Sequence, residues 1–501
     1  MDFAALRDLA AGNLWSSIWP ELSLGCLALL LLALEILWPR RWHGLIPAVS
    51  IAGQVVLLAL VIADHSVPYR ATFNGLLMQS PLGQLMRAFL LAASVLVSVL
   101  ARESLPGRGV PRVEFHHVIL VVTGALMLLV QSRNFVMLFV ALETLTVGLY
   151  VLVSYYRSNA ATLEAGLKYL VMGALSSALL LFGIVLLYGV AGSAGLPGRT
   201  ADAMQFSALA GFLEANPHNF LAAAGITLVL AGVAFKIGAF PFQIWVADVY
   251  QGAPTPVTAL LAVSSKAAGF VVLLVLVREV FTPYEWLVTP VLVFMAAGTI
   301  LFGNLAALKQ RNVKRLIGLS GVSHAGFMLL AVIPSAHSAA AAGAVYFYLI
   351  SYLLASFAVF GVMTILSGPD DTAQDLGDYA GLARQSPFLA GVLACGLGSL
   401  AGIPPLAGFV GKLFVFVAAF RSGHYGLLAL AIAGVVASIY YYFGWIRAAY
   451  FSDEAPVSEA TLARARAGGG ALLRVALAVL AAGSIVLGFY QGPLGRLVSG
   501  R

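Results

Sequence analysis

Residues 220–250 read FLAAAGITLVLAGVAFKIGAFPFQIWVADVY, an apolar run interrupted by Lys236 and Pro241. The run is longer than the roughly 20 residues that cross ~30 Å of hydrocarbon. Proline removes a backbone donor and clashes with the preceding turn, so we expect the helix to break near Pro241. An amine at membrane depth costs at least ~3 kcal/mol on insertion scales and is usually paired or hydrated, which marks this segment as a functional position.

Apolar runs of this kind recur along the whole chain of 501 residues. Hydrophobic residues make up 61% of it and charged residues 10%, and the mean hydropathy is +0.96. One large soluble core would not be divided into about fourteen runs of membrane-spanning length. The sequence therefore predicts an all-α polytopic membrane protein with about fourteen transmembrane helices. The runs cover residues 21–39, 44–64, 83–101, 115–132, 134–156, 163–190, 219–250, 255–280, 286–307, 313–333, 338–366, 386–421, 425–450 and 471–490.

A second long run, residues 386–421, is interrupted as well. Pro404 and Pro405 precede Lys412 there, whereas Pro241 follows Lys236 in the first run. Paired interruptions in two halves of a chain are typical of transporters built from repeats, although the different order of proline and lysine leaves the repeat open. We expect four regions. They are an N-terminal three-helix segment (1–114), two five-helix repeats (115–280 and 281–450), and a C-terminal loop with the fourteenth helix (451–501).

Basic residues in the loops indicate the orientation. Alternate loops on one side hold fifteen of them, and the opposite set, with both termini, holds nine. The positive-inside rule therefore predicts that the loops with fifteen basic residues face the cytoplasm and that both termini lie on the outer side of the membrane. No removable signal peptide is expected, because residues 1–12 lack a basic region and the run from Leu22 to Trp38 is followed at once by another span. The fifteen are Arg40, Arg41, Arg102, Arg108, Arg112, Arg157, Lys309, Arg311, Lys314, Arg315, Arg384, Arg447, Arg464, Arg466 and Arg474.

Residue types that build redox, metal or nucleotide sites are sparse. Cys26 and Cys395 lie far apart, without a CxxC motif or a histidine cluster, which favours neither a disulfide framework nor a zinc or iron–sulfur site. The sequence has no glycine-rich dinucleotide motif and no P-loop. The formal net charge of +7 is spread over short loops, so nucleic-acid binding is not expected. We expect no cofactor and no metal in this chain.

Lys236 is the first candidate for proton transfer, and Glu143, in the apolar run 134–153, is the carboxylate best suited to pair with it. If that carboxylate were withdrawn, burial would favour loss of the lysine's proton, so a movable pair would act as a proton switch. The plainer alternative is that Lys236 snorkels to an interface.

Lys266 and Lys412 are the second and third candidates. Ser264 and Ser265 can hold a water beside Lys266, and the glycines before Lys412 allow water to enter. The alternatives are that backbone carbonyls near the helix break satisfy Lys266, and that Lys412 snorkels.

His324 and Lys168 are possible relay groups. An imidazole accepts and donates a proton near neutral pH, so His324 can link two lysines, or it can be a hydrogen-bonded core histidine. Lys168 has Glu164 four residues before it, a spacing that suits a relay or a simple salt bridge at a helix end. Asp248 is interpreted as a helix cap, the basic loop at 308–316 as a topology signal, and the acidic loop at 367–382 as solvated surface.

Four ordered stretches resemble a known family. They are FVALETLTVGLYVLVSYYRSNAATLEAGLKYLVMGALSSALLLFGIVLLYG, AFKIGAFPFQIWVADVYQGAPTPVTALLAVSSKAAGF, NLAALKQRNVKRLIGLSGVSHAGFMLL and GIPPLAGFVGKLFVF. The sequence is similar, from about residue 115 to 450, to the antiporter-like membrane subunits of proton-pumping NADH:quinone oxidoreductase, respiratory complex I. The similarity is greatest to the N-type subunit.

The resemblance implies fourteen helices, two inverted five-helix repeats with discontinuous helices 7 and 12, two half-channels, and a buried axis of charged groups. It assigns the family's fifth-helix glutamate to Glu143 and its three helix lysines to Lys236, Lys266 and Lys412. M-type subunits carry a glutamate where this chain has Lys412. L-type subunits extend past the fourteenth helix into a long lateral helix, whereas this sequence ends at Arg501. Gln243 departs from the family, which commonly has histidine there, and a glutamine side chain cannot take up a proton.

The function implied is that of a proton-translocating subunit, an enzyme component without a redox centre of its own. FMN, iron–sulfur clusters and quinone would lie in partner subunits, and the partners would be an M-type antiporter-like subunit and the small K-, J- and A-type subunits. One alternative is a subunit of a Mrp-type cation/proton antiporter, which would use the same lysines without a redox partner. Another is a structural scaffold that translocates nothing.

Overall fold

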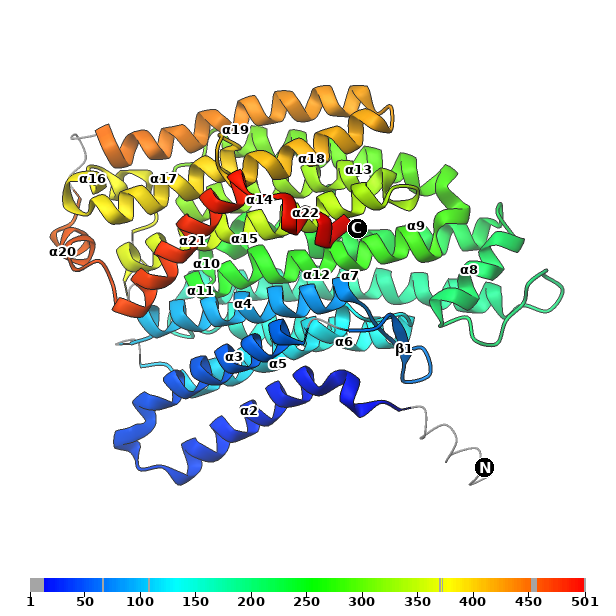
Figure 1. The fold of residues 1–501 in the computed structure, drawn as a ribbon, viewed down its shortest axis with the longest axis horizontal. Coiled ribbons are helices and arrows are strands. Elements are labelled where there is room, and N and C mark those ends of the chain that lie inside the picture. The colour runs from blue at the N-terminus through cyan, green and yellow to red at the C-terminus, as the bar shows by residue number, and fades with distance from the viewer. Residues whose placement is uncertain are drawn as a thin grey trace.

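The computed structural model describes residues 13–64, 67–106, 109–368, 371, 373–451 and 457–499. They form a bundle of helices that run mostly along one axis, with the connecting segments gathered at its two ends (Figure 1). Thirteen of the described helices are long and apolar enough to cross a membrane. The predicted all-α polytopic class is therefore confirmed. The prediction that residues 1–12 contain no signal peptide lies outside the described residues.

The N-terminal segment contains three of these helices, α2 (Trp19–Leu37), α3 (Ile46–Ala63) and α4 (Pro81–Ser104). A short hairpin of β1 (Arg70–Thr72) and β2 (Leu77–Gln79) joins α3 to α4. Ser80 caps α4 by accepting a hydrogen bond from the Gly83 N–H, and Pro81 stands at the first helical position, where its missing donor costs nothing.

A buried ion pair ties α2 to α4. The Arg87 guanidinium donates to both carboxylate oxygens of Glu21, over 2.8 and 2.9 Å, and to the Ser17 carbonyl over 2.7 Å. Gln131 donates to Glu21 as well. The exposed fractions of the two charged side chains are 2% for Arg87 and 5% for Glu21. Because every charged atom has a partner, the pair is tolerated where a lone charge would be strongly unfavourable.

The middle of the chain forms two successive groups of helices. The first comprises α5 (Arg112–Leu129), α6 (Phe135–Val153), α7 (Ala160–Ala191), α8 (Phe206–Ala215), α9 (Phe220–Ile237), α10 (Trp245–Gly252), α11 (Thr255–Leu260) and α12 (Lys266–Val275). The second comprises α13 (Glu285–Ala307), α14 (Val313–Val332), α15 (Ala339–Ser367), α16 (Leu382–Gln385), α17 (Pro387–Ala401), α18 (Ala407–Arg421) and α19 (Tyr425–Phe451). The C-terminal helices are α20 (Glu459–Ala467), α21 (Ala471–Phe489) and α22 (Gly492–Ser499).

Two of the expected spans are divided, and the two divisions begin in the same way. Gly238 follows α9 with a φ of 69°, and Gly402 follows α17 with a φ of 83°, both in the left-handed region that suits glycine. In each case the next residue donates to the carbonyl five positions back, Ala239 to Ala234 and Ile403 to Gly398. This is the Schellman ending of a helix, and the prolines that follow prevent its continuation. The span expected at 386–421 therefore consists of α17 and α18, each of 15 residues.

α21 packs directly on the second division. A Cβ added at Gly488 would lie 1.7 Å from the Pro405 carbonyl oxygen, whereas one added at Gly483 would lie 3.4 Å from the Leu354 side chain. We expect Gly488→Ala to force the backbone at the division apart, at a cost of about 1–3 kcal/mol, and to lower the melting temperature of the assembled complex. Gly483→Ala, on the same helix, is the control and should leave it unchanged. Equal melting temperatures for the two variants would contradict this packing.

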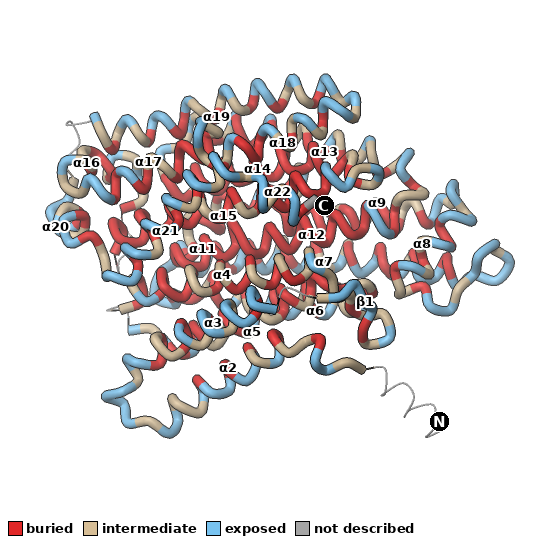
Figure 2. The backbone as a smooth tube through the Cα atoms, viewed as in Figure 1, coloured by how far each residue is buried: buried red, intermediate tan, exposed pale blue. Residues whose placement is uncertain are grey.

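The most buried helices lie at the centre of the bundle. The 18-residue window assessed on α14 is entirely buried, and the corresponding share is 94% for the span 255–280 and 89% for α15. Figure 2 shows buried positions concentrated in these helices, whereas α2 and α19 alternate between buried and exposed. Lys266 and His324, which lie on the central helices, are therefore enclosed within the bundle.

A candidate axis of buried amines

The three candidate lysines are all buried. Their exposed fractions are 7% for Lys236 and 4% each for Lys266 and Lys412. None of the three ammonium groups reaches the surface of the bundle, so the snorkelling alternative does not describe this geometry. Each is held by an oxygen acceptor, and the three acceptors belong to different helices.

Lys236, in the last turn of α9, donates to the Thr146 hydroxyl on α6 over 2.5 Å. The rings of Tyr169 and Phe235 lie about 6 Å from its ammonium. Thr146 in turn donates to the Leu142 carbonyl. Hydroxyl oxygens can accept and donate at once, so Thr146 joins the amine to the backbone of α6.

The expected contact between Glu143 and Lys236 is not formed. Glu143 instead accepts a hydrogen bond of 2.5 Å from Ser177 on α7. It lies three residues before Thr146, the acceptor of Lys236, on the same face of α6. The Ser177 hydroxyl binds Glu143 and the Thr146 hydroxyl binds Lys236, so each charged group has its own partner. The prediction of a direct pair did not consider these hydroxyls.

Lys266 begins α12 directly after a π-helical turn at Leu261–Ser265. Its ammonium donates to the Gly321 carbonyl on α14 over 2.6 Å and lies 5.3 Å from the centre of the Tyr352 ring. A Cβ at Gly321 would meet the Lys266 nitrogen at 2.9 Å, so glycine leaves the room that the amine occupies. Single π turns inside α-helices are frequent at functional positions, and this one sets the face on which Lys266 projects.

His324, on α14, lies between two phenols. Its Nδ1 is 2.6 Å from the Tyr348 hydroxyl and its Nε2 is 3.0 Å from the Tyr442 hydroxyl. The Tyr352 ring stands 5.1 Å from the imidazole, which places one aromatic ring beside both Lys266 and His324. The partners of His324 are these two phenols, and it is hydrogen-bonded to neither lysine. The relay and the core-histidine interpretations therefore both remain predictions.

Lys412, on α18, reaches back across the helix division. It donates to the carbonyl of Ala401, the last residue of α17, over 2.8 Å, and lies 5.3 Å from the Phe327 ring. The final carbonyls of a helix lack intrahelical partners and carry partial negative charge. The division therefore supplies Lys412 with an acceptor that an unbroken helix would not offer.

Two small cavities lie between these groups. One, of about 10 Å³, is bordered by Lys236 and by Ser265, the neighbour of Lys266. The other, also about 10 Å³, is bordered by His324, Tyr348 and Ser399, which lies at the end of α17 near Lys412. Each is about the size that admits a single water with polar partners. Water-sized spaces thus occur at both ends of the segment from Lys266 to His324.

Lys168 lies apart from this axis. It pairs with Glu164 and with Asp248, at 2.7 Å each, and its side chain is 43% exposed. Arg315 binds the other oxygen of Asp248 over 2.6 Å. Asp248 is therefore a bridge between α7 and α14 rather than only a helix cap. A relay role for Lys168 remains a prediction.

Lys314 is, like Arg87, a buried cation that was not predicted from the sequence. The Lys314 side chain has no exposed surface, donates to the Ala253 carbonyl over 2.9 Å and pairs with Asp371. Asp371 also accepts from Thr255, the first residue of α11. The acidic segment that contains Asp371 is therefore not only solvated surface, and the basic loop does more than mark topology. In the sequence, Lys314 and Asp371 stand among other charged residues, as exposed loop residues commonly do, so their burial could not be predicted.

No group of three or more metal-binding side chains is found in the part of the chain that the structure describes. Cys26 and Cys395 are both free thiols. Gln243, the departure from the family pattern, is buried just after the first division, and its side-chain oxygen has no hydrogen-bond partner among the described residues.

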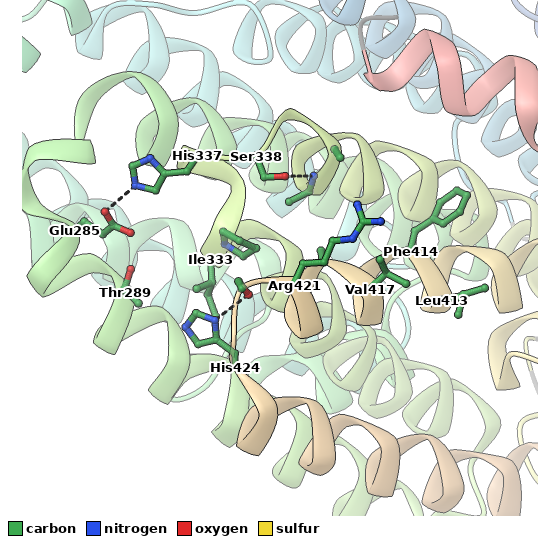
Figure 3. A pocket seen from close by; sticks show the side chains of 15 residues that line it. Glu285, Thr289, Ile333, His337, Ser338, Leu413, Phe414, Val417, Arg421 and His424 are labelled. Carbon is green, nitrogen blue, oxygen red and sulfur yellow. Dashed lines mark hydrogen bonds and ion pairs between the residues drawn. The ribbon is translucent and has the colours of Figure 1, made fainter.

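A cavity of about 760 Å³ opens on the other side of α18 (Figure 3). It is lined by Leu413, Val417 and Arg421, which share one helical face that excludes Lys412. Across it His337 pairs with Glu285 at 2.8 Å. The cavity does not touch the Lys412 amine, so it is not a direct continuation of the axis.

A bundle of membrane-length helices with two divided spans and buried amines defines an antiporter-like membrane subunit. Residues 132–439 match the family described as NADH:quinone oxidoreductase/Mrp antiporter, transmembrane. The chain is 63% identical to NADH-quinone oxidoreductase subunit N 1 of Opitutus terrae, over 99% of both chains. It is 33% identical to NAD(P)H-quinone oxidoreductase subunit 2 of Synechococcus sp., over 98% of this chain and 91% of that one. The chain belongs to this family, in its subunit N branch.

Solved structures agree with that assignment. A chain of respiratory complex I from Thermus thermophilus with bound aureothin has a TM-score of 0.78 and 31% identity, with 96% of this chain and 99% of that chain covered. A chain of the Mrp complex from Dietzia sp. DQ12-45-1b also has a TM-score of 0.78, but its identity is 22%, over 97% of both chains, so it shows a common fold alone.

Proposed function

We propose that this chain is the N-type, proton-translocating subunit of the membrane arm of a bacterial respiratory complex I. The observation that carries the proposal is the line of buried amines, Lys236, Lys266 and Lys412, interleaved with hydroxyls, an imidazole and water-sized cavities. Isolated ammonium groups in a membrane interior are costly and mark proton or ion pathways. Residues 115–280 and 281–450 would form the two half-channels.

The electron-transfer groups, FMN, iron–sulfur clusters and quinone, would be held by other subunits. The direct partners would be an M-type antiporter-like subunit and the K-, J- and A-type small subunits. Both termini would face the periplasm, because the loops with the larger number of basic residues would face the cytoplasm. The 63% identity to a subunit N over the full length supports this setting over an isolated antiporter.

The geometry suggests how a proton would pass. The Lys236 ammonium would release its proton to a water in the cavity that it shares with Ser265, and that water would pass a proton to neutral Lys266. Lys266 would pass one toward His324 past Tyr352, and the cavity beside Ser399 would lead on to Lys412. Glu143 would set the first step, because its charge favours the protonated form of Lys236 and its withdrawal removes that support.

One experiment separates the proposed function from the Mrp-type alternative. The complex containing this chain is purified under mild conditions, and its absorbance and quinone reductase activity are recorded. We expect flavin and iron–sulfur absorbance and NADH-dependent quinone reduction. Their absence, together with cation/proton exchange in vesicles, would favour the antiporter.

Thr146 provides a sharper test of the first step. Thr146→Val keeps the shape of the side chain but leaves the Lys236 ammonium without its acceptor, and an unsatisfied buried group costs about 1–3 kcal/mol. We expect the rate of proton transfer through this subunit to fall by up to about tenfold, which lowers the number of protons translocated per quinone reduced by at most the share that this subunit contributes. Thr146→Ser keeps the hydroxyl and should retain translocation. Equal translocation by the valine and serine variants would show that the hydroxyl has no part in the step.

A further inference from the structure

A second large cavity lies where α13 and α19 end together. Its volume is about 860 Å³, and its lining includes residues 308–311, which directly follow α13, and one face of α19. Tyr440, Phe443, Arg447 and Phe451 lie on that face at intervals of three and four residues. At 1.5 Å per residue the face extends about 16 Å from the helix end toward the membrane interior.

Three cations line this cavity, and no acidic side chain in the described part of the chain pairs with them. The side chains of Lys309, Arg311 and Arg447 are exposed. None of them forms a hydrogen bond or an ion pair with any residue that the structure describes. No Asp or Glu is among the lining residues. Asp375 and Asp378 lie close to the lining residue Leu376. They form a capping box at the start of a short helix, in which the carboxylate of each accepts a hydrogen bond from the backbone N–H of the other.

The remaining walls of the cavity are apolar and aromatic. Tyr440 is 72% exposed, Phe443 45% and Phe451 78%. Large aromatic side chains that stay exposed at a helix end are typical of the boundary between hydrocarbon and headgroups. The cavity therefore combines a cationic mouth with an apolar wall that leads into the membrane.

The cavity beside Arg421 lacks this combination. Its polar groups are largely paired with one another, His337 with Glu285 and His424 with Ser422, and a carboxylate is present (Figure 3). A single guanidinium is left without a partner there, against three cations in the cavity of α13 and α19. The contrast indicates that the second cavity is complementary to a ligand with more than one negative oxygen.

We propose that the cavity between the ends of α13 and α19 binds an anionic phospholipid. The phosphate group contacts Lys309, Arg311 and Arg447, and an acyl chain lies along Phe443 and Tyr440. Basic pockets between transmembrane helices are suited to such headgroups, and each cation near the membrane surface strengthens binding by about fivefold. A neutral zwitterionic lipid gains less, because its own ammonium repels the three cations.

The bound lipid braces a helix that serves the axis. Tyr441, which lines the same cavity, donates to Asn304 over 3.2 Å, and Asn304 donates to Ser323, the neighbour of His324. The hydroxyl of Tyr442, the next residue of α19, forms a hydrogen bond with His324. A lipid that joins the ends of α13 and α19 therefore steadies the phenol that contacts the imidazole. The proposal does not depend on the proton-transfer role, because it concerns binding alone.

The test uses the purified complex with the full-length chain, stripped of phospholipid and titrated with phosphatidylglycerol in mixed micelles. Native mass spectrometry reads the bound lipid, with phosphatidylcholine as the neutral comparison. The triple variant Lys309→Gln, Arg311→Gln, Arg447→Gln should bind phosphatidylglycerol about 100-fold more weakly. The control triple variant Arg40→Gln, Arg157→Gln, Arg474→Gln removes the same charge from exposed positions outside the cavity and should bind within about twofold of the parent.

A second measurement covers the case in which the triple variant fails to assemble. A photo-crosslinking residue at Tyr440, in an otherwise unchanged chain, should yield an adduct with the mass of phosphatidylglycerol. Equal binding by the parent and the pocket variant, or equal losses in the two triple variants, would overturn the proposal. Capture of a neighbouring subunit from position 440 would overturn it as well, because the cavity would then be a protein interface.

Discussion

Replacing Lys236 by methionine is expected to abolish proton transfer through this subunit. The substitution keeps the volume of the buried stem but removes the group that receives and releases the proton, and loss of a positioned proton carrier costs about 100-fold or more in rate. The measurement is the number of protons translocated per quinone reduced, in vesicles that contain the assembled complex. The ratio should fall by the share that this subunit contributes.

Two further variants separate proton transfer from charge and from packing. Lys236→Arg keeps the positive charge but cannot release its proton, so it should fail as the methionine variant does. Arg157→Met removes an exposed cation outside the axis and outside the cavity of α13 and α19, and should leave the ratio unchanged. If Lys236→Arg translocates normally, Lys236 acts through its charge alone and the transfer mechanism is wrong.

Arg87→Met is expected to be the most destabilising of these substitutions. It strands the Glu21 carboxylate in a site where only 5% of its side chain is exposed. Breaking a buried ion pair from one side costs about 3–5 kcal/mol, because the remaining charge is left without compensation. We expect the chain to be depleted from the assembled complex and the complex to melt at a lower temperature.

Two comparisons test the origin of that loss. Arg133→Met breaks a pair with Glu279, whose side chain is 37% exposed, and should cost at most about 1 kcal/mol. The double variant Glu21→Met, Arg87→Met removes both buried charges and should recover most of the stability. A double variant as unstable as Arg87→Met would show that packing, and not the unpaired carboxylate, explains the loss.

The helical class could be predicted from the sequence because apolar length is a local property. The length of each apolar run predicts a membrane span without reference to the rest of the chain, and proline marks where a helix cannot continue. What marks the divisions as a matched pair is the Schellman ending at Gly238 and Gly402, which depends on φ values and hydrogen bonds that composition does not reveal. The contact between Gly488 and Pro405 joins segments 83 residues apart and leaves no local trace in the sequence.

The candidate site was predictable in part for the same reason. Buried lysines in apolar runs are conspicuous, and the structure buries all three. Their partners were not predictable, because Thr146, Tyr348 and Tyr442 look like ordinary helix residues until tertiary packing turns their hydroxyls inward. Opposite charge suggested Glu143 for Lys236, but a hydroxyl on the same helix face satisfies the amine instead.

The acceptors along the axis have one electrostatic property in common. Lys266 and Lys412 rest on backbone carbonyls, and the described hydrogen-bond partners of His324 are phenols, so no carboxylate contacts any of the three. The interior from Lys266 to Lys412 therefore carries either no charge or positive charge, and protonated neighbours repel each other across a medium of low dielectric constant. Occupancy of one amine disfavours occupancy of the next, which makes the row anticooperative. In the proposed transfer, a proton that enters at one end would lower the free energy needed to expel one at the other, and the same proton need not travel the whole length.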